Sequence, residues 1–248
     1  MRWSFFSGFA IVLACCFACH AEPFILKDAT TFLELEEKAL EGQFDFDIVL
    51  ESDVDLSGLE VPPLGTTDSG ECHAYGGHFD GRGFTIHNFA MNNSENKVYL
   101  DAGLFCGLKG ARIENLVIDK SCSFVGYCSG ALAGLTEGSF HVHNITSNAI
   151  VVGFHVGGFV GLVNGVTSGT ITVNDSRVEG AHYPTRFHGG FIGTVRNCSN
   201  LNIEMTGNAF TANRQQLFHM NYYGGLIGLM DDSFSSSLNI SHCETHGL

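Results

Sequence analysis

Apolar and polar residues alternate along most of this chain in short stretches, which is typical of half-buried β-strands. The clearest stretches are Ala111–Asp119, Phe140–Thr146, Thr170–Asp175, Asn200–Met205 and Leu238–Ser241. From Gly76 onward no helical period of useful length occurs. The pattern therefore predicts an all-β architecture for this part of the chain.

A glycine phrase precedes each of these stretches. The phrases are GLFCG at Gly103–Gly107, GALAG at Gly130–Gly134, GGFVG at Gly157–Gly161, GGFIG at Gly189–Gly193 and GGLIG at Gly224–Gly228. Their first glycines are 27, 27, 32 and 35 residues apart, so one unit is repeated and stacked. Short strands in such a unit predict a right-handed parallel β-helix, with turns about 4.8 Å apart. The longer spacings predict loop insertions at His182–Phe187 and Asn208–Tyr222.

The residues before the repeats differ in pattern. Asp28 to Gly42 is predicted as a capping helix, with a capping box from Thr31 to Glu34 and Gly42 as the stop signal. Its predicted apolar side consists of Phe32, Leu33, Leu35, Ala39 and Leu40. A strand is expected at Ile48–Leu50. We assign residues 22–75 to a cap region and residues 76–248 to the repeats, which we expect to be truncated at the C-terminus.

The first twenty-one residues resemble an export signal. Arg2 precedes an apolar run from Phe5 to Ala18, and Cys19-His20-Ala21 offers a cleavage site. No later stretch is long and apolar enough to predict a transmembrane segment. The sequence thus predicts a secreted, extracellular or cell-surface protein. The residues around Cys15 match the pattern of a bacterial lipid-anchor signal poorly.

Composition narrows the possible partners. The net charge of −14 opposes binding to nucleic acid and to anionic membrane surfaces. The 21 phenylalanines argue mainly for core packing.

Six of the nine cysteines follow Ala21. An even number in an exported chain permits disulfides, for which the candidates are Cys72, Cys122, Cys128, Cys198 and Cys243. Cys122 and Cys128 are near enough in sequence to bridge a local loop. Cys106 aligns with apolar residues of the other repeats, so we expect it to be a buried hydrophobe.

Two motifs resemble known repeat proteins. Gly77–Phe89 resembles the FxGxFDGxGxTIxNL opening of extracellular β-helix proteins, and the glycine phrases followed by asparagines resemble the GLUG-type repeat of surface proteins. Val54–Gly58 with Pro62–Gly65 is similar to the lead-in of the same modules. The resemblance implies an extracellular β-helix and indicates almost nothing about activity. GLUG-type repeats also occur in some bacterial peptidases, but this chain contains no His-Glu-x-x-His motif.

Few residues of the sequence suggest catalysis or metal binding. Asp231-Asp232 is the only adjacent acidic pair of the repeats and is interpreted as a turn. His141 and His143 share one strand face, and a third metal ligand is not identifiable. We therefore assign no catalytic, cofactor-binding or metal-binding residue, and we expect no cofactor.

Asparagines have two candidate roles. Asn115, Asn144, Asn174 and Asn239 recur near strand ends, which predicts a stack of side chains from turn to turn. Candidate glycosylation sequons start at Asn92, Asn144, Asn174, Asn197 and Asn239.

The middle residue of each glycine phrase faces opposite to its apolar neighbour if the phrase is extended. These middle residues are Phe105, Leu132, Phe159, Phe191 and Leu226. They form either an exposed apolar binding stripe or part of the core, and the sequence leaves both open. Overall it favours non-catalytic adhesion, binding of carbohydrate or surface-protein ligands, or a structural role. The alternative is a carbohydrate-active enzyme, a polysaccharide lyase or glycoside hydrolase. The oligomeric state stays open.

Overall fold

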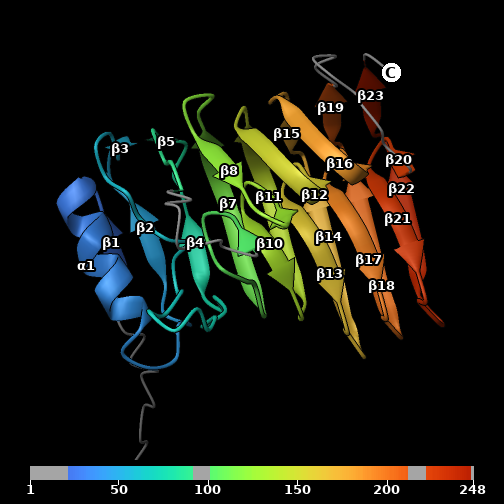
Figure 1. Cartoon of the computed structure of the whole chain (residues 1–248), viewed down its shortest axis with the longest axis horizontal. Helices are drawn as coiled ribbons and strands as arrows, with labels where there is room; N and C mark the ends of the chain where they lie inside the picture. The colour runs from blue at the N-terminus through green and yellow to red at the C-terminus, as the bar shows by residue number, and fades with distance from the viewer. Residues whose placement is uncertain (1–21, 92–100, 212–221, 247–248) are drawn as a thin grey trace, which may run out of the picture.

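The structure, a computed structural model, describes residues 22–91, 101–211 and 222–246. Its strands stack as a parallel β-solenoid of about six turns, with one short helix near the N-terminus. Figure 1 shows the turns in chain order, from the helix at one end to β20–β23 at the other. The prediction of an all-β, parallel β-helix is confirmed.

In the described part of the chain, three sheets make up the solenoid, and every strand pairing within them is parallel. The long sheet contains β1 (Phe24–Leu26), β2 (Ile48–Leu50), β4 (His78–Asp80), β7 (Ala111–Ile118), β11 (Phe140–Ser147), β14 (Gly169–Asn174), β18 (Leu201–Thr206) and β22 (Ser237–Ser241), with β3 (Val54–Asp55), β5 (Thr85–His87), β15 (Arg177–Val178), β19 (Ala209–Thr211) and β23 (Glu244–His246) beside them. The six-stranded sheet contains β6 (Asp101–Ala102), β8 (Ser123–Val125), β9 (Cys128–Ser129), β12 (Ile150–Gly157), β16 (His182–Gly189) and β20 (Tyr222–Gly224). The four-stranded sheet contains β10 (Ala133–Thr136), β13 (Val160–Asn164), β17 (Ile192–Arg196) and β21 (Ile227–Asp231).

The helix α1 (Ala29–Ala39) covers the first turn of the solenoid. Its N-cap is Asp28, whose carboxylate accepts from the Thr31 amide at 2.8 Å, so the capping box is Asp28–Thr31 and not Thr31–Glu34. Phe32, Leu35 and Ala39 are buried, whereas Leu33 and Leu40 are exposed. The predicted apolar side was therefore too wide. Among the described residues, no helix is both long and apolar enough to span a membrane.

The glycine phrases form the corner between the six-stranded and the four-stranded sheets. Gly157 ends β12, and a Cβ added there would lie 2.0 Å from the carbonyl oxygen of Val160 in β13. A Cβ on Gly161 would lie 2.4 Å from the Ser129 amide nitrogen in β9. Two backbones approach this closely only where no side chain separates them. The repeated glycines thus reflect contact between sheets.

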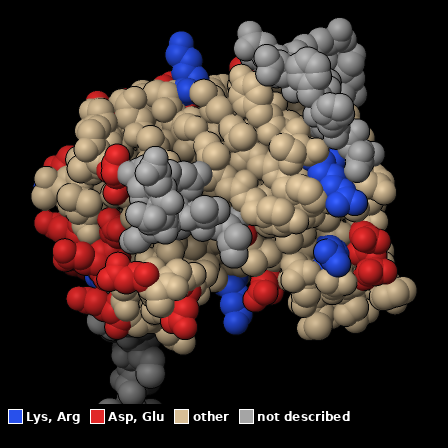
Figure 2. All heavy atoms as spheres, in the orientation of Figure 1, with Lys and Arg blue, Asp and Glu red and all other residues tan. Residues whose placement is uncertain are grey.

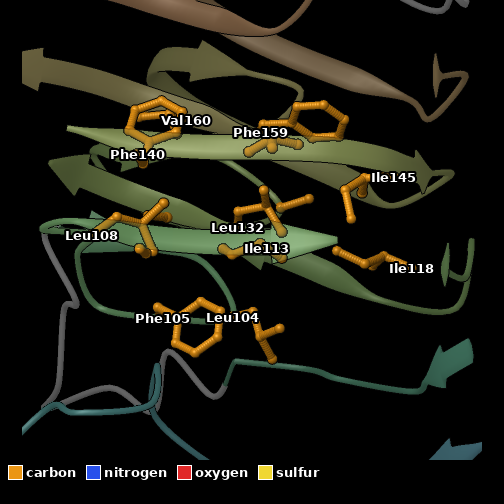
Figure 3. Close-up of a cluster of buried hydrophobic side chains, with 14 of the residues drawn as sticks. Leu104, Phe105, Leu108, Ile113, Ile118, Leu132, Phe140, Ile145, Phe159 and Val160 are labelled. Atoms are coloured by element: carbon orange, nitrogen blue, oxygen red, sulfur yellow. The ribbon is translucent and has the colours of Figure 1, made fainter. Parts of the chain in front are cut away.

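This corner turns the middle residues inward. Phe159 lies among the buried side chains in Figure 3. The five middle residues are all buried, with exposed fractions of 0% at Phe105, Leu132, Phe159 and Phe191 and 9% at Leu226. The exposed binding stripe is therefore wrong, because the flanking glycines turn the chain and bury both sets of apolar residues.

The insertion sites also differ from the prediction. Residues 182–187 are not a loop but belong to β16, which pairs with β12 from Val151–His182 to Gly157–Gly189. The segment 208–222 includes β19 and the start of β20, and its residues 212–221 lie outside the described part.

One disulfide joins Cys72 to Cys106. The expectation that Cys106 is an unbridged hydrophobe is wrong because the first phrase is shifted by one residue. Phe105 pairs with Ala133, so Cys106 takes a position that is glycine in later turns. The other disulfide candidates, Cys122, Cys128, Cys198 and Cys243, are free thiols. Cys122 and Cys128 do not bridge, because Cys122 donates to the Ile86 carbonyl whereas Cys128 contacts Asp101.

The asparagine stack is shorter than predicted. Asn115 and Asn144 both have a left-handed backbone, and Asn144 Nδ2 donates to Asn115 Oδ1 at 2.8 Å. In the next turn Asp175 takes this backbone conformation, whereas Asn174 and Asn239 lie within β14 and β22. Asn, Asp and Gly all tolerate a left-handed backbone, so this conformation recurs at the same position of each turn while the residue type changes.

We expect the Gly157→Ala substitution to destabilise the fold by about 2 kcal/mol or more, because the new methyl group would overlap the Val160 carbonyl. Gly42→Ala is the matched control, since a Cβ at Gly42 meets nothing within 4 Å. Its free energy of unfolding should change by less than about 0.5 kcal/mol. Urea unfolding measures both, and equal effects would contradict the corner contact.

Candidate functional site

Four aromatic side chains form a row on the outside of the six-stranded sheet. The aromatic row consists of Tyr127, Phe154, Phe187 and Tyr222, which come from successive turns. Tyr127 stacks on Phe154 with ring centroids 4.7 Å apart, and Phe187 stacks on Tyr222 at 5.2 Å. An edge contact of 5.4 Å between Phe154 and Phe187 joins the two pairs.

The row is partly open to solvent. Tyr127 is 48% exposed and Tyr222 is 45% exposed, while Phe187 lies beneath Arg186 and is buried. The Arg186 guanidinium lies 5.3 Å from the Phe154 ring centre and 5.1 Å from that of Phe187, which is cation–π distance. The row therefore combines exposed rings at both ends with one cation over its middle.

A β-bulge gives the row its shape. The amides of Phe154 and His155 both donate to the Tyr127 carbonyl, and the register of β12 against β16 shifts at this point. A bulge re-aims the side chains beside it. Phe154 consequently stacks on Tyr127, while the His155 ring stacks on Phe187 at 4.6 Å.

A second feature, the acidic pocket, lies beside the first turns. It is a cavity of about 640 Å³. Its charged and polar side chains are those of Gln43, Asp45, His73, Asp101, Lys109, Thr136 and Glu137, and its apolar lining includes Phe44, Leu108 and Leu135. The Cys72–Cys106 disulfide forms part of its wall.

The row and the pocket meet at β9. Asp101 of β6 pairs with Cys128 of β9, and Cys128 directly follows Tyr127 of the aromatic row. The Cys128 thiol interacts with the Asp101 carboxyl group. Burial, together with the nearby charge of Glu137, raises the pKa of Asp101 above its usual value.

Asp101, Cys128 and His155 occupy one register column, which by composition resembles a nucleophilic triad. Their protonation states oppose that role. Burial and the Asp101 charge raise the pKa of the Cys128 thiol. Burial, with the charges of Arg196 and Arg186, lowers the pKa of His155 to about 4, and its Nδ1 is paired with Thr194 Oγ1 at 2.8 Å. Thiol and imidazole are therefore both neutral near pH 7, whereas an activated cysteine nucleophile requires a thiolate.

Two buried histidines lie further along the solenoid. His182 Nδ1 and His188 Nε2 are 2.8 Å apart, and burial lowers their pKa values to about 3 and about 4. Their other ring nitrogens are buried and have no partner among the described residues. This pair therefore stays neutral near pH 7.

The structure does not bring the sequence-derived candidates together. His141 contacts Thr172 and His143 contacts Asp175, both on an exposed face. Asp231 is the last residue of β21, so the turn interpretation is wrong for it, whereas Asp232, which follows the strand, has a left-handed backbone. In the described part of the chain, no group of three or more His, Cys, Asp or Glu is arranged to hold a metal ion.

The candidate glycosylation sites are placed as follows. Asn144 and Asn197 are exposed and donate to neighbouring asparagines, Asn174 is partly buried in β14, and Asn239 is exposed in β22. Asn92 lies outside the described residues.

The sequence did contain a signal for the aromatic row that its interpretation missed. An aromatic residue stands two or three positions before four of the glycine phrases, at Tyr127, Phe154, Phe187 and Tyr222. Composition had assigned the phenylalanines to the core, and the two tyrosines had been given no role. The acidic pocket has no such signal, because its lining comes from segments far apart in sequence.

Comparison with known proteins supports the fold alone. No family model and no curated protein matches the sequence. A crystal structure named "putative immunoglobulin A1 protease" from Bacteroides ovatus superposes with a TM-score of 0.57 at 16% sequence identity. The match covers 90% of this chain and 84% of that chain. The resemblance to GLUG-type repeats thus rests on the motifs only.

We expect His155→Gln to flatten the pH dependence of stability. The depressed pKa of His155 contributes stability that is fully present above about pH 6.5 and is lost as pH falls toward 4, because the unfolded histidine takes up a proton first. The wild type should lose on the order of 2–3 kcal/mol more than the variant over this interval.

The matched control is His141→Gln. His141 also pairs with a threonine hydroxyl through Nδ1, at 2.9 Å, but on an exposed face. This substitution leaves His155 in place, so the variant should keep the wild-type loss of stability between pH 7 and 4. Urea unfolding between pH 7 and 4 gives these slopes, and identical slopes for the two variants would contradict a special role of burial.

Proposed function

We propose that this chain is an exported β-solenoid that binds an extended glycan along the aromatic row and holds it without catalysis. The observation that carries the proposal is the row itself, with one aromatic side chain from each of four successive turns. Aromatic rings pack against the apolar C–H faces of sugars, while hydroxyl groups take the polar contacts around them.

The shape of the row favours a linear polymer over a protein. A stable protein–protein interface covers about 800 Å² on each partner and needs a broad surface. The aromatic row is one side chain wide and follows the stacking direction of the turns, so a chain of sugar units matches it better. In Figure 2 the middle of this face carries few charged residues, whereas acidic residues gather over the end where α1 and β2 lie.

Export is supported by four observations. The first twenty-one residues have the pattern of a signal peptide, which lies outside the described part. The Cys72–Cys106 disulfide fits an oxidising compartment. The sequons at Asn144, Asn197 and Asn239 start at exposed residues, and we keep them, with Asn92 and Asn174, as proposed glycosylation sites. The GLUG-type resemblance fits the same location.

Catalysis is the second candidate function. The named structural neighbour suggests peptidase activity, but the likeness shows the fold alone, and the neutral Cys128 and His155 do not support a cysteine nucleophile. A carbohydrate-active enzyme has one observation in its favour, since Asp101 and Glu137 both line the acidic pocket. Release of reducing ends or unsaturated products from a bound polysaccharide would establish this alternative.

We expect Tyr127→Ala and Tyr222→Ala each to weaken binding to a retained polysaccharide by about tenfold, because each removes an exposed ring from the row. Affinity electrophoresis against a panel of soluble polysaccharides first identifies the ligand, and titration calorimetry then measures the variants.

The matched control is Phe234→Ala, since Phe234 is 71% exposed and lies outside the row. It should bind like the wild type. Failure of every polysaccharide to retard the protein, or an equal loss in all three variants, would reject the proposed function.

A further inference from the structure

We infer that the glycan held on the aromatic row is acidic, and that Arg186 selects it by binding a carboxylate carried by one of its sugar units. This inference rests on the proposed function, because it names the class of ligand for the same site. Arg186 belongs to β16, and its guanidinium lies over the middle of the row, between the two exposed tyrosines.

The first argument is that Arg186 has no ion-pair partner among the described residues. Its contacts are aromatic, at 5.3 Å from the ring centre of Phe154 and 5.1 Å from that of Phe187. A cation–π contact uses the charge of a guanidinium but none of its five N–H donors. Arg186 is exposed, so these donors are free to form the bidentate bond to a carboxylate for which their geometry is suited.

The second argument is the charge of the strands beneath the row. β12, β16 and β20 carry three of its four rings, and they contain Arg186 but neither Asp nor Glu. The acidic residue of the six-stranded sheet is Asp101 of β6, which pairs with β9 at the Tyr127 end of the row. Figure 2 shows acidic residues gathered over the far end of the solenoid, where α1 and β2 lie. The surface around Arg186 is therefore locally positive.

The net charge of the whole chain, −14, acts against this local charge. At physiological ionic strength, however, interactions between exposed charges are screened over a distance of about 8 Å. The groups within that distance of a bound carboxylate decide its affinity. The distant acidic residues mainly slow the approach of an acidic glycan.

The third argument is a second guanidinium, that of Arg196 at the end of β17. The charges of Arg196 and Arg186 both act on His155, whose ring stacks on Phe187 at 4.6 Å. Both arginines therefore place positive charge near the middle of the row. Asp231 is the register neighbour of Arg196 in β21 and offsets part of its charge, which leaves Arg186 as the main cation.

An acidic sugar unit matches this combination of groups. A uronic acid has an apolar C–H face, which can pack on an aromatic ring, and one carboxylate at the edge of its ring. With the sugar face on the row, the carboxylate can accept charge-assisted hydrogen bonds from the guanidinium beside it. A neutral sugar makes the aromatic contact alone.

The test compares ligands that differ only in charge. Oligomers of galacturonic, glucuronic and mannuronic acid are titrated into the whole protein near pH 7, where carboxylates are ionised, alongside their carboxyl-reduced, neutral forms of equal length. We expect an acidic oligomer to bind about fivefold more tightly than its neutral form, which is the upper end for an exposed ion pair. Added salt should reduce the difference, because it screens the charges.

The variants assign the preference to Arg186. Arg186→Gln should bring the acidic oligomer and its neutral form close to equal affinity without weakening the neutral form. Arg186→Lys keeps the charge but not the planar donors, so it should keep part of the preference. The matched control is Arg177→Gln, which removes an exposed guanidinium of the long sheet, outside the row, and should keep the preference in full.

The outcomes separate this inference from the proposed function. Equal binding of acidic and neutral forms, weakened by Tyr127→Ala, rejects the carboxylate contact and leaves glycan binding intact. A preference that Arg186→Gln does not reduce also rejects it, as does an equal loss of both forms, which would mean that Arg186 only covers Phe187. Retention of a neutral polysaccharide but of no acidic oligomer has the same meaning. Binding of no glycan rejects both proposals, and oligoglutamate binding that is sensitive to Arg186→Gln would then indicate an acidic protein partner.

Discussion

The close contact between the backbones of the six-stranded and four-stranded sheets is the constraint on which the rest of this solenoid depends. At Gly157 and Gly161 the neighbouring main-chain atoms lie where a side chain would begin. This contact turns the chain sharply within one glycine phrase and directs residues such as Phe159 into the core. It also fixes the outer surface, because the strand before each phrase must present its alternate residues to solvent.

The candidate site follows from that arrangement. Stacking in register brings one residue from each turn into a column, so an aromatic side chain repeated before the phrases becomes a row of rings in contact. The same rule places Asp101 beside Cys128 and Cys128 beside His155. In this column burial decides the chemistry, because it keeps the thiol and the imidazole neutral and leaves the carboxyl group of Asp101 poorly solvated.

Much of the architecture could be predicted from local patterns. Alternation identified five strands of the long sheet, β7, β11, β14, β18 and β22, to within one residue at each end, and the glycine period indicated stacking. The errors arose where equivalence between turns had to be guessed. The phrase containing Cys106 is shifted by one residue relative to the next turn, and His182–Phe187 continues a strand through what spacing suggested was a loop. Register is set by pairing between turns, which a single sequence does not display.

By itself the sequence determined the repeat, the β class, the acidic charge and the residues available at each turn, because these depend on composition and short-range periodicity. Only the tertiary structure decided which faces are covered. It buried the middle residues of the glycine phrases, left Tyr127 and Tyr222 exposed, paired Cys72 with Cys106, and gathered Asp45, Asp101 and Glu137 around one cavity. The physical reason is that burial and proximity are properties of contacts between turns, which lie tens of residues apart along the chain.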